Sequence, residues 1–295
     1  MPDGTSLPET TDAPGPSRVI LGENLAVLAT LASNSFEMIY IDPPFNTGKD
    51  QVRRAMRTTA HEMGDRVGFS GKRYLTEVTS SLSYGDAFGD YLAFLEPRIR
   101  EAHRLLSRSG TFYLHLDYRE VHYAKVLADD IFGRNNFLNE IIWAYDYGAR
   151  ARRKWPAKHD NILVYAKDVD SYHFDATQVD REPYMAPGLV TKEKAALGKL
   201  PTDVWWHTIV SPTGTEKTGY PTQKPAAIVR RMITASTRPG DWVLDFFAGS
   251  GTTGAAAQEL GRTFVLVDQS EDSFIVMQKR LGREGICYED LRAPR

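Results

Sequence analysis

The sequence predicts an α/β fold in which helices cover both faces of a mostly parallel sheet. Apolar runs of strand length alternate with amphipathic helical segments along most of the chain. Several of these runs are continuously apolar, which is typical of strands buried on both faces. A glycine-rich turn near residue 250 leads directly from an apolar run into a helical segment. Strands that alternate with helices in this way build a parallel sheet.

The individual elements follow from hydrophobic periodicity in chain order. Strands are expected at 18–21, 36–41, 111–116, 137–145, 161–167, 241–247 and 262–268, with a last one near Cys287. Helices are expected at 23–31, 90–106, 118–132, 225–237, from 252 onward, and at 271–281. Proline at position 97 should kink the second helix or mark its first turn.

Three segments break this alternation. The first 17 residues are rich in Pro, Gly, Ser, Thr and acid, and we expect a disordered tail. Residues 46–88 are polar and aperiodic, and a loop of this length is normally functional or mobile. From 168 to 221 the pattern dissolves into Pro, Gly and charged residues around Trp205-Trp206, a pair expected to anchor to a local core.

Composition excludes several classes of protein. The chain has 295 residues, and none of its apolar runs approaches the roughly 18 residues that a membrane span requires. The N-terminus lacks the basic start and hydrophobic core of a secretory signal. Its single cysteine, Cys287, excludes an intrachain disulfide and a thiolate zinc cluster. We therefore expect a cytoplasmic protein without a metal site.

Local charge indicates contact with nucleic acid, although the net charge is only −2. Two basic segments, residues 49–73 and 147–159, carry aromatic residues among or beside their charges, a pattern that favours phosphate contact over a solvated face. The predicted DNA-binding residues are Lys49, Arg53 and Arg54 in the first segment and Arg150, Arg152, Arg153, Lys154 and Lys158 in the second. In the second segment, Trp155 either stacks on the nucleic acid or anchors the segment to the core.

The glycine-rich turn reads Gly249-Ser250-Gly251-Thr252-Thr253-Gly254, and Asp268 ends the next expected strand. This is the pattern of a dinucleotide site, so an NAD-dependent oxidoreductase has to be considered, as does a plain packing turn. Asp245, directly before the turn, would repel a pyrophosphate but suits an ammonium group. S-Adenosyl-L-methionine has an ammonium and a ribose without a pyrophosphate. Asp245 can hold its amino-acid end, and Asp268 can accept hydrogen bonds from both ribose hydroxyls.

A second motif ends the expected strand 36–41, where the sequence continues Asp42-Pro43-Pro44-Phe45. Two prolines end a strand wherever they occur, so this stretch alone is equally consistent with a turn. Together, "IDPPFNTG", "YPTQKP" and "LDFFAGSGTTGAAA" resemble the bacterial amino-group DNA methyltransferases, and their order resembles the β group of that family. The resemblance covers residues 18 to about 285 and weakens across 168–215.

The resemblance implies a Rossmann-like methyltransferase fold whose seven-stranded sheet has one reversed strand. It divides the chain into a catalytic half at 18–145 with a flap at 46–88, a target-recognition region at 146–221 and a cofactor-binding half at 222–295. The implied catalytic residues are Asp42, Pro43, Pro44 and Phe45. The implied cofactor-binding residues are Asn24, Lys224, Pro225, Asp245, Phe247, Gly249, Gly251, Thr252 and Asp268.

The chemistry of an exocyclic amine explains the first motif. Its nitrogen lone pair is delocalised into the base, so it is a poor nucleophile. Asp42 and the carbonyl of Pro43 can each accept one N–H and turn the lone pair toward the methyl group, while prolines keep that carbonyl rigid. Phe45 offers a flat face to a base flipped out of the duplex. Cytosine carbon-5 chemistry is excluded, because it needs a cysteine nucleophile and no Pro-Cys pair exists.

The sequence thus predicts a site-specific enzyme that methylates duplex DNA. In this family a motif that begins with Asp is associated with adenine N6, and cytosine N4 stays open as the alternative. A non-catalytic nucleic-acid-binding protein is a more distant one. A cognate restriction endonuclease is a candidate partner, and either a monomer or a homodimer is compatible with the sequence.

Overall fold

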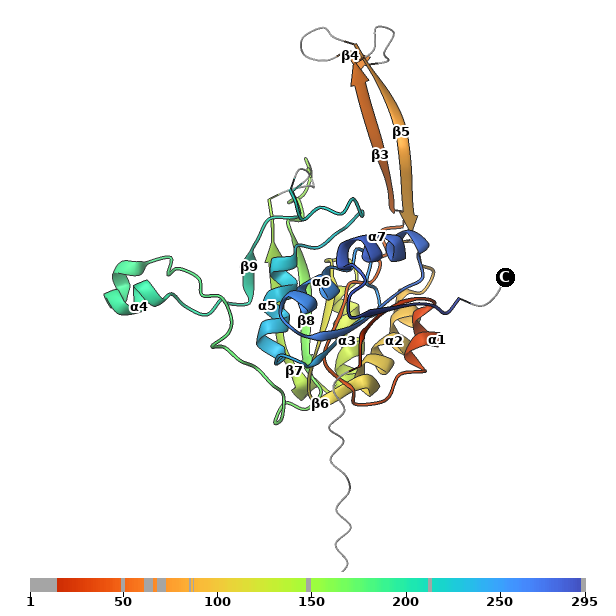
Figure 1. Cartoon of the computed structure of the whole chain (residues 1–295). Helices are drawn as coiled ribbons and strands as arrows, with labels where there is room; N and C mark the ends of the chain where they lie inside the picture. The colour runs from red at the N-terminus through yellow and green to blue at the C-terminus, as the bar shows by residue number, and fades with distance from the viewer. Residues whose placement is uncertain are drawn as a thin grey trace, which may run out of the picture.

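A nine-stranded sheet forms the centre of the computed structural model of the chain (Figure 1). The structure describes residues 15–48, 51–60, 66–67, 73–84, 86, 88–146, 150–211 and 214–292, and within 51–84 it describes the course of the backbone. The strand order is β12-β1-β11-β10-β2-β6-β8-β7-β9. The strands are β1 (Ser17–Leu21), β2 (Phe36–Ile41), β6 (Leu106–Leu116), β7 (Phe137–Ala144), β8 (His159–Ala166), β9 (Val204–Trp206), β10 (Trp242–Asp245), β11 (Thr263–Asp268) and β12 (Ile286–Asp290).

Strand direction in this sheet agrees with the prediction, whereas the strand number does not. Strand β8 runs antiparallel to both of its neighbours, β6 and β7, and every other neighbouring pair is parallel. One reversed strand in a mostly parallel sheet is therefore confirmed. The family resemblance implies seven strands, and the sheet has nine. Of the two edge strands, β12 lies where a last strand was expected near Cys287, and β9 was not expected. The three-residue strand β9 is too short to produce a periodic signal.

Helices cover both faces of the sheet, as predicted. On one face α1 (Asn24–Leu28), α2 (Tyr91–Leu105) and α3 (Val121–Phe132) pack on the larger buried apolar cluster. On the other, α5 (Ala226–Ser236), α6 (Thr252–Glu259) and α7 (Glu271–Leu281) pack on a second cluster. Strand β2 contributes to both, because Ile39 and Ile41 face the first cluster while Met38 and Tyr40 face the second. Burial on both sides explains its continuously apolar sequence.

Helix α2 begins beside Asp90, whose side chain accepts a hydrogen bond from the backbone N–H of Ala93. The helix continues through Pro97 to Leu105. Pro97 therefore lies inside the helix and does not mark its first turn.

A second, three-stranded sheet occupies a segment predicted to be irregular. Strands β3 (Gln51–Ala60) and β5 (Arg73–Tyr84) form an antiparallel hairpin, with β4 (Arg66–Val67) paired to β5. The hairpin stands away from the main sheet (Figure 1). Because neither of its faces covers the main core, its strands need no alternating apolar positions, and hydrophobic periodicity could not reveal them. The prediction of an irregular loop over 46–88 is wrong for this part.

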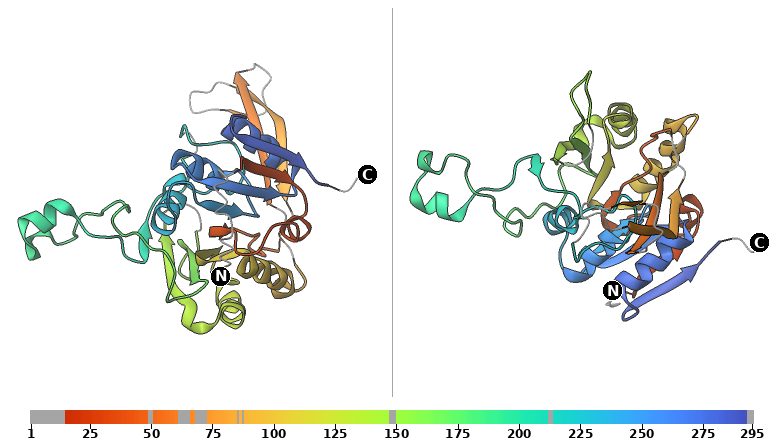
Figure 2. Two further views of the ribbon diagram at one scale, coloured as in Figure 1. Left: turned by 60° about the horizontal axis from the view of Figure 1, so that its bottom comes forward. Right: turned by 90° about the horizontal axis from the view of Figure 1, so that it is seen from above.

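The predicted disordered tail lies outside the described residues up to position 14, and Ser17 at its end already belongs to β1. Residues 168–221 contain little regular structure, as expected. They include η2 (Pro187–Leu189), α4 (Lys192–Leu197) and the edge strand β9, and α4 lies on an arm that projects from the body in every view (Figures 1 and 2).

The tryptophan pair in this region divides between the core and the surface. Trp205 is 7% exposed and packs in the second cluster, but Trp206 is 73% exposed. The prediction of a core anchor therefore holds for Trp205 alone. Within the described part of the chain, none of the helices has the length and apolar character to cross a bilayer.

Candidate active site

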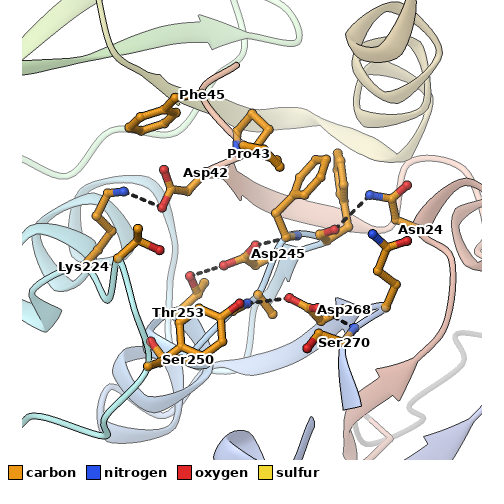
Figure 3. Close-up of a pocket in the computed structure, with 18 of the residues that line it drawn as sticks. Asn24, Asp42, Pro43, Phe45, Lys224, Asp245, Ser250, Thr253, Asp268 and Ser270 are labelled. Atoms are coloured by element: carbon orange, nitrogen blue, oxygen red, sulfur yellow. Dashed lines mark hydrogen bonds and ion pairs between the residues drawn. The ribbon is translucent and has the colours of Figure 1, made fainter. Parts of the chain in front are cut away.

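One cavity of about 520 Å³ lies where the strands β2, β10 and β11 end. These strands run parallel, so the residues at their carboxyl ends meet at one edge of the sheet. Asp42 follows β2, Asp245 ends β10 and Asp268 ends β11, and all three line the cavity. In Figure 3, Phe45, Asp42 and Lys224 lie toward one end of this cavity and Asn24 and Asp268 toward the other. Parallel strand ends are the usual place for ligands in folds of this class.

The structure brings most of the predicted site residues together here. All four predicted catalytic residues line the cavity. Of the predicted cofactor-binding residues, two do not line it, Gly251 and Pro225, although each is adjacent in sequence to one that does. Those that do line it are Asn24, Lys224, Asp245, Phe247, Gly249, Thr252 and Asp268.

One oxygen of the Asp42 carboxylate accepts a hydrogen bond, and the other does not. Its Oδ2 accepts a hydrogen bond from Lys224 Nζ at 2.6 Å, and the two side chains are 16% and 11% exposed. Its Oδ1 is buried and has no hydrogen-bond partner among the described residues. A buried carboxylate oxygen without a donor is costly, so this atom is suited to receive an N–H from a ligand.

The Pro44-Phe45 stretch after Asp42 is held in place by its neighbours. Tyr91 donates its hydroxyl to the carbonyl of Pro44 at 2.6 Å. Phe45 is half-buried, and Lys224 Nζ lies 4.8 Å from its ring centroid. The motif therefore places an aromatic face and a carboxylate on one wall of the cavity.

Asn46 turns the chain sharply away from this wall. Its φ of 53° lies in the left-handed region, which asparagine tolerates better than most residues. Its side chain fixes the turn from both sides, since it donates to Glu120 at 2.7 Å and accepts from the backbone N–H of Phe88 at 3.0 Å. This turn separates the Asp42–Phe45 motif from the hairpin that follows it.

The glycine loop forms the opposite wall. Gly249 and Gly251 have φ values of 49° and 71°, a region that favours glycine, and Gly251 caps the N-terminus of α6. A Cβ atom on Gly251 would lie 2.8 Å from Met277 Cγ, so the close packing of α7 also requires glycine there. Asp268 accepts hydrogen bonds from the backbone N–H groups of Gly249 at 2.8 Å and Ser270 at 2.9 Å. The loop and this carboxylate therefore hold each other in place.

Three carboxylates, those of Asp42, Asp245 and Asp268, lie in this cavity and repel one another. The pKa of Asp245 is raised to about 7, first by burial and then by the nearby carboxylates of Asp42 and Asp268, against the hydrogen bonds that Asp245 accepts. Those bonds come from Thr253 Oγ1 at 2.5 Å and the backbone N–H of Phe247 at 3.0 Å. Burial also raises the pKa of Asp268. A ligand that brings positive charge would relieve this repulsion.

The sequence model of the DNA methylase family, which comprises N6- and N4-amino methyltransferases, matches residues 36–279. The chain belongs to this family. It is 30% identical over 271 residues to the DNA adenine methyltransferase YhdJ of Escherichia coli K12, a match that covers 89% of this chain and 82% of that protein. It is 29% identical over 268 residues to the Type II methyltransferase M.HpaI of Haemophilus parainfluenzae, a match that covers 90% of this chain and 74% of that enzyme.

Solved structures of DNA methyltransferases share the fold. The cytosine-N4-specific PvuII DNA methyltransferase superimposes with a TM-score of 0.63 at 14% identity, over 95% of this chain and 97% of that one. The complex of M1.HpyAVI with S-adenosylmethionine superimposes with a TM-score of 0.55 at 21% identity, over 90% and 100% of the two chains. The predicted Rossmann-like methyltransferase fold is confirmed.

Several cavity residues of this DNA methylase were not predicted. Arg98 on α2 donates to Asn24 Oδ1 at 2.9 Å, and Asn24 in turn donates to the carbonyl of Phe246 at 3.2 Å. Nothing in the spacing of the sequence connects Arg98 to Asn24, because they meet only through helix packing. Tyr40 and Thr253 could have been found, since both lie within two residues of a predicted site residue.

The predicted DNA-binding residues of the methylase lie in different environments. Lys49 lies outside the described residues, and Arg53 and Arg54 lie on β3 of the hairpin. Lys158 is half-buried and donates to the backbone carbonyl of Asp146 at 2.5 Å. The exposed group is Arg150, Arg152, Arg153 and Lys154. Trp155 beside them is 95% exposed, so the alternative in which it anchors to the core is wrong.

Proposed function

We propose that this DNA methylase transfers a methyl group to the exocyclic N6 amine of adenine in duplex DNA. The observation that carries the proposal is Asp42, which lines the same cavity as the glycine loop and whose buried Oδ1 lacks a partner among the described residues. Asp42, which can accept an N–H from an amine, and the glycine loop, which suits the methyl donor, thus line the same cavity. Methylation of cytosine N4 is the second candidate, because both amines present the same geometry to a carboxylate.

The cofactor is S-adenosyl-L-methionine, which supplies a methyl group on a positively charged sulfur. The acidic cavity fits a ligand that carries an ammonium and a sulfonium, since its carboxylates repel one another. We assign Asp245 to the ammonium group, Asp268 to the ribose hydroxyls and the backbone of Gly249 to close contact with the ligand. Asn24, at the far end of the cavity, is assigned to the adenine side.

The catalytic motif is proposed to act by orientation and charge. Asp42 Oδ1 and the carbonyl of Pro43 each accept one N–H of the target amine, so its nitrogen becomes more tetrahedral and its lone pair points at the methyl group. Phe45 stacks on the base after it is flipped out of the duplex. The ammonium of Lys224 pairs with the Asp42 carboxylate and lies beside the ring of Phe45.

Two observations favour adenine over cytosine as the target base. The motif begins with Asp42, and the relative YhdJ, a DNA adenine methyltransferase, is 30% identical. The test is to incubate the protein with unmethylated plasmid and S-adenosylmethionine, digest the DNA and identify the modified nucleoside by mass spectrometry. N6-methyladenine supports the proposal, N4-methylcytosine supports the second candidate, and unmodified DNA contradicts both.

The Type II relatives also support a place in restriction and modification, with a cognate endonuclease that cuts the same site. A DNA substrate favours a cytoplasmic location. The exposed segment 150–154 is proposed to contact the DNA backbone near the recognition region, together with the hairpin β3–β5.

Replacing Arg152 and Arg153 with alanine should weaken DNA binding and make it less sensitive to salt. Both side chains are exposed, and the slope of log affinity against log salt should fall by about one unit for each phosphate that is no longer neutralised. Fluorescence anisotropy with labelled duplex at several salt concentrations measures this slope. The matched control replaces Arg108 and Arg134, which are also exposed. They lie near the amino ends of β6 and β7, whereas the segment 150–154 follows the carboxyl end of β7. Equal slopes for the two double variants would contradict the assignment.

A further inference from the structure

A chain of buried polar groups leads away from the cavity wall. The fully buried imidazole of His115, on β6, lies between Tyr40 and Asp160. Its Nδ1 is 2.8 Å from the hydroxyl oxygen of Tyr40, and its Nε2 is 3.3 Å from Asp160 Oδ2. Tyr145 donates its hydroxyl to the other oxygen, Asp160 Oδ1, at 3.0 Å. The four side chains therefore form one continuous path of hydrogen bonds, which the proposed function does not yet use.

The charges along this path determine where its protons lie. Burial acts to raise the pKa of Asp160, but the hydrogen bonds from His115 and Tyr145 and the charge of Lys224 hold it below its ordinary value. Asp160 is therefore ionised and can only accept, so His115 donates through Nε2–H. In its neutral form the imidazole then has a lone pair at Nδ1, which can accept the proton of the Tyr40 hydroxyl. Burial raises the pKa of Tyr40 well above its ordinary value, so Tyr40 stays protonated at rest.

The path begins at the reaction site and ends near the surface. Tyr40 lines the cavity together with Asp42, which lies two residues further along the chain, directly after β2. The ring of Phe45 rests 6.0 Å from the imidazole of His115. At the other end, Tyr145 is half-buried and follows β7.

We propose that Tyr40, His115 and Asp160 form a proton relay that receives the proton released by the target amine. The inference rests on the proposed function. As the amine nitrogen bonds to the methyl carbon, the methyl–sulfur bond breaks and its electron pair stays on sulfur. The nitrogen now carries one proton too many. The proton that faced the Pro43 carbonyl, which is too weak a base to keep it, passes to the Tyr40 oxygen while the proton of Tyr40 passes to His115 Nδ1, and Asp160 stabilises the imidazolium.

The relay explains how Asp42 can remain ionised throughout. If Asp42 took the proton, it would lose its charge and with it the buried ion pair to Lys224. Tyr40 is the catalytic residue of the relay, because it faces the cavity, and His115 and Asp160 are positioning residues. The titratable and charged groups around the imidazole and its partners come from several elements. They are Tyr40 and Asp42 from β2 and its end, Asp117 after β6, Tyr145 after β7, Asp160 from β8, Lys224 before α5 and Asp245 at the end of β10.

The test measures the single-turnover rate of methyl transfer to plasmid DNA from acidic to alkaline pH, with tritiated cofactor kept saturating at every pH so that changes in cofactor affinity do not contribute. In the wild-type protein the rate should fall on the acidic side, because an imidazole that already holds two protons cannot accept the one from Tyr40. Tyr40→Phe breaks the relay at its first atom. It should lower the rate about 10²-fold near neutral pH and abolish the acidic limb of the profile. Asp160→Asn should shift that limb and lower the rate less.

Tyr113→Phe is the matched control, because Tyr113 is a buried tyrosine on β6 whose hydroxyl bonds to Ser236 at 2.6 Å, away from the relay. Its pH profile should equal that of the wild-type protein, and calorimetry with the cofactor confirms that each variant is folded. A wild-type rate independent of pH, or a Tyr40→Phe profile equal to the control, would overturn the relay. A wild-type protein that methylates no plasmid would instead contradict the proposed function.

Discussion

Asp42→Ala should abolish methyl transfer and leave cofactor binding nearly unchanged. The carboxylate lies at the Phe45 end of the cavity, and its unpartnered Oδ1 is the atom assigned to the target amine. A hydrogen bond made to developing charge in a preorganised site contributes about 10²–10³ in rate when removed singly. A tritium-transfer assay on plasmid DNA measures the loss, and calorimetry with S-adenosylmethionine measures binding.

Asp129→Ala is a close structural control for this variant. Asp129 on α3 accepts from Lys125 Nζ at 2.6 Å, as Asp42 accepts from Lys224, and the pair is 18% and 24% exposed. Both variants therefore lose an ion pair of the same length and similar burial, but Asp129 lies away from the cavity and its loss should leave the rate unchanged. Activity of Asp42→Ala within about tenfold of wild type would be too small an effect for a transition-state contact and would sink the assignment.

Much of the catalytic wall could be predicted because its residues follow strand ends. The strand 36–41 was predicted with the bounds that the structure gives, and Asp42 follows it directly. Asp245 and Asp268 end two further strands, and parallel strands bring their carboxyl ends to one edge. Asp245 and Asp268 were assigned to one site from the glycine-rich turn, and Asp42 was added through the family resemblance. The parallel strand ends explain why the three acids meet.

The features that were not predicted depend on contacts that leave no local pattern in the sequence. The strands of the hairpin lack a regular apolar alternation, and β9 has only three residues. The path from Tyr40 through His115 to Asp160 joins three strands, β2, β6 and β8, at positions that no spacing rule relates. Only the register of β6 against β8 brings His115 beside Asp160. Long-range pairing of this kind is a property of the folded sheet.

Asp245→Asn should make the protein without cofactor more stable and bind the cofactor less tightly. Burial raises the pKa of this carboxyl from 3.8 to about 7, so the folded state resists its ionisation. Below about pH 4 the group is protonated in both the folded and the unfolded protein, and it has no effect on stability. As the pH rises toward 7, the unfolded chain ionises freely while the folded protein does not, so stability falls and then stays lower.

At pH 8 the amide avoids this cost, and we expect the free energy of unfolding to rise by about 2–4 kcal/mol, with no difference from wild type near pH 4. The ammonium group of the cofactor meanwhile loses a hydrogen bond to a charged group that contributes about 1.5–3 kcal/mol, which corresponds to a dissociation constant raised about 10- to 100-fold. Wild-type affinity should itself increase as the pH rises through 7, because the ionised form of Asp245 is the one that binds. Thermal unfolding at pH 4 and pH 8 measures the difference in stability, and calorimetry at pH 5 and pH 8 measures cofactor affinity, with exposed Asp170→Asn as the control for a removed charge. Saturable binding of NAD in the same calorimeter, or unchanged cofactor affinity in Asp245→Asn, would show that this carboxylate does not face an ammonium group.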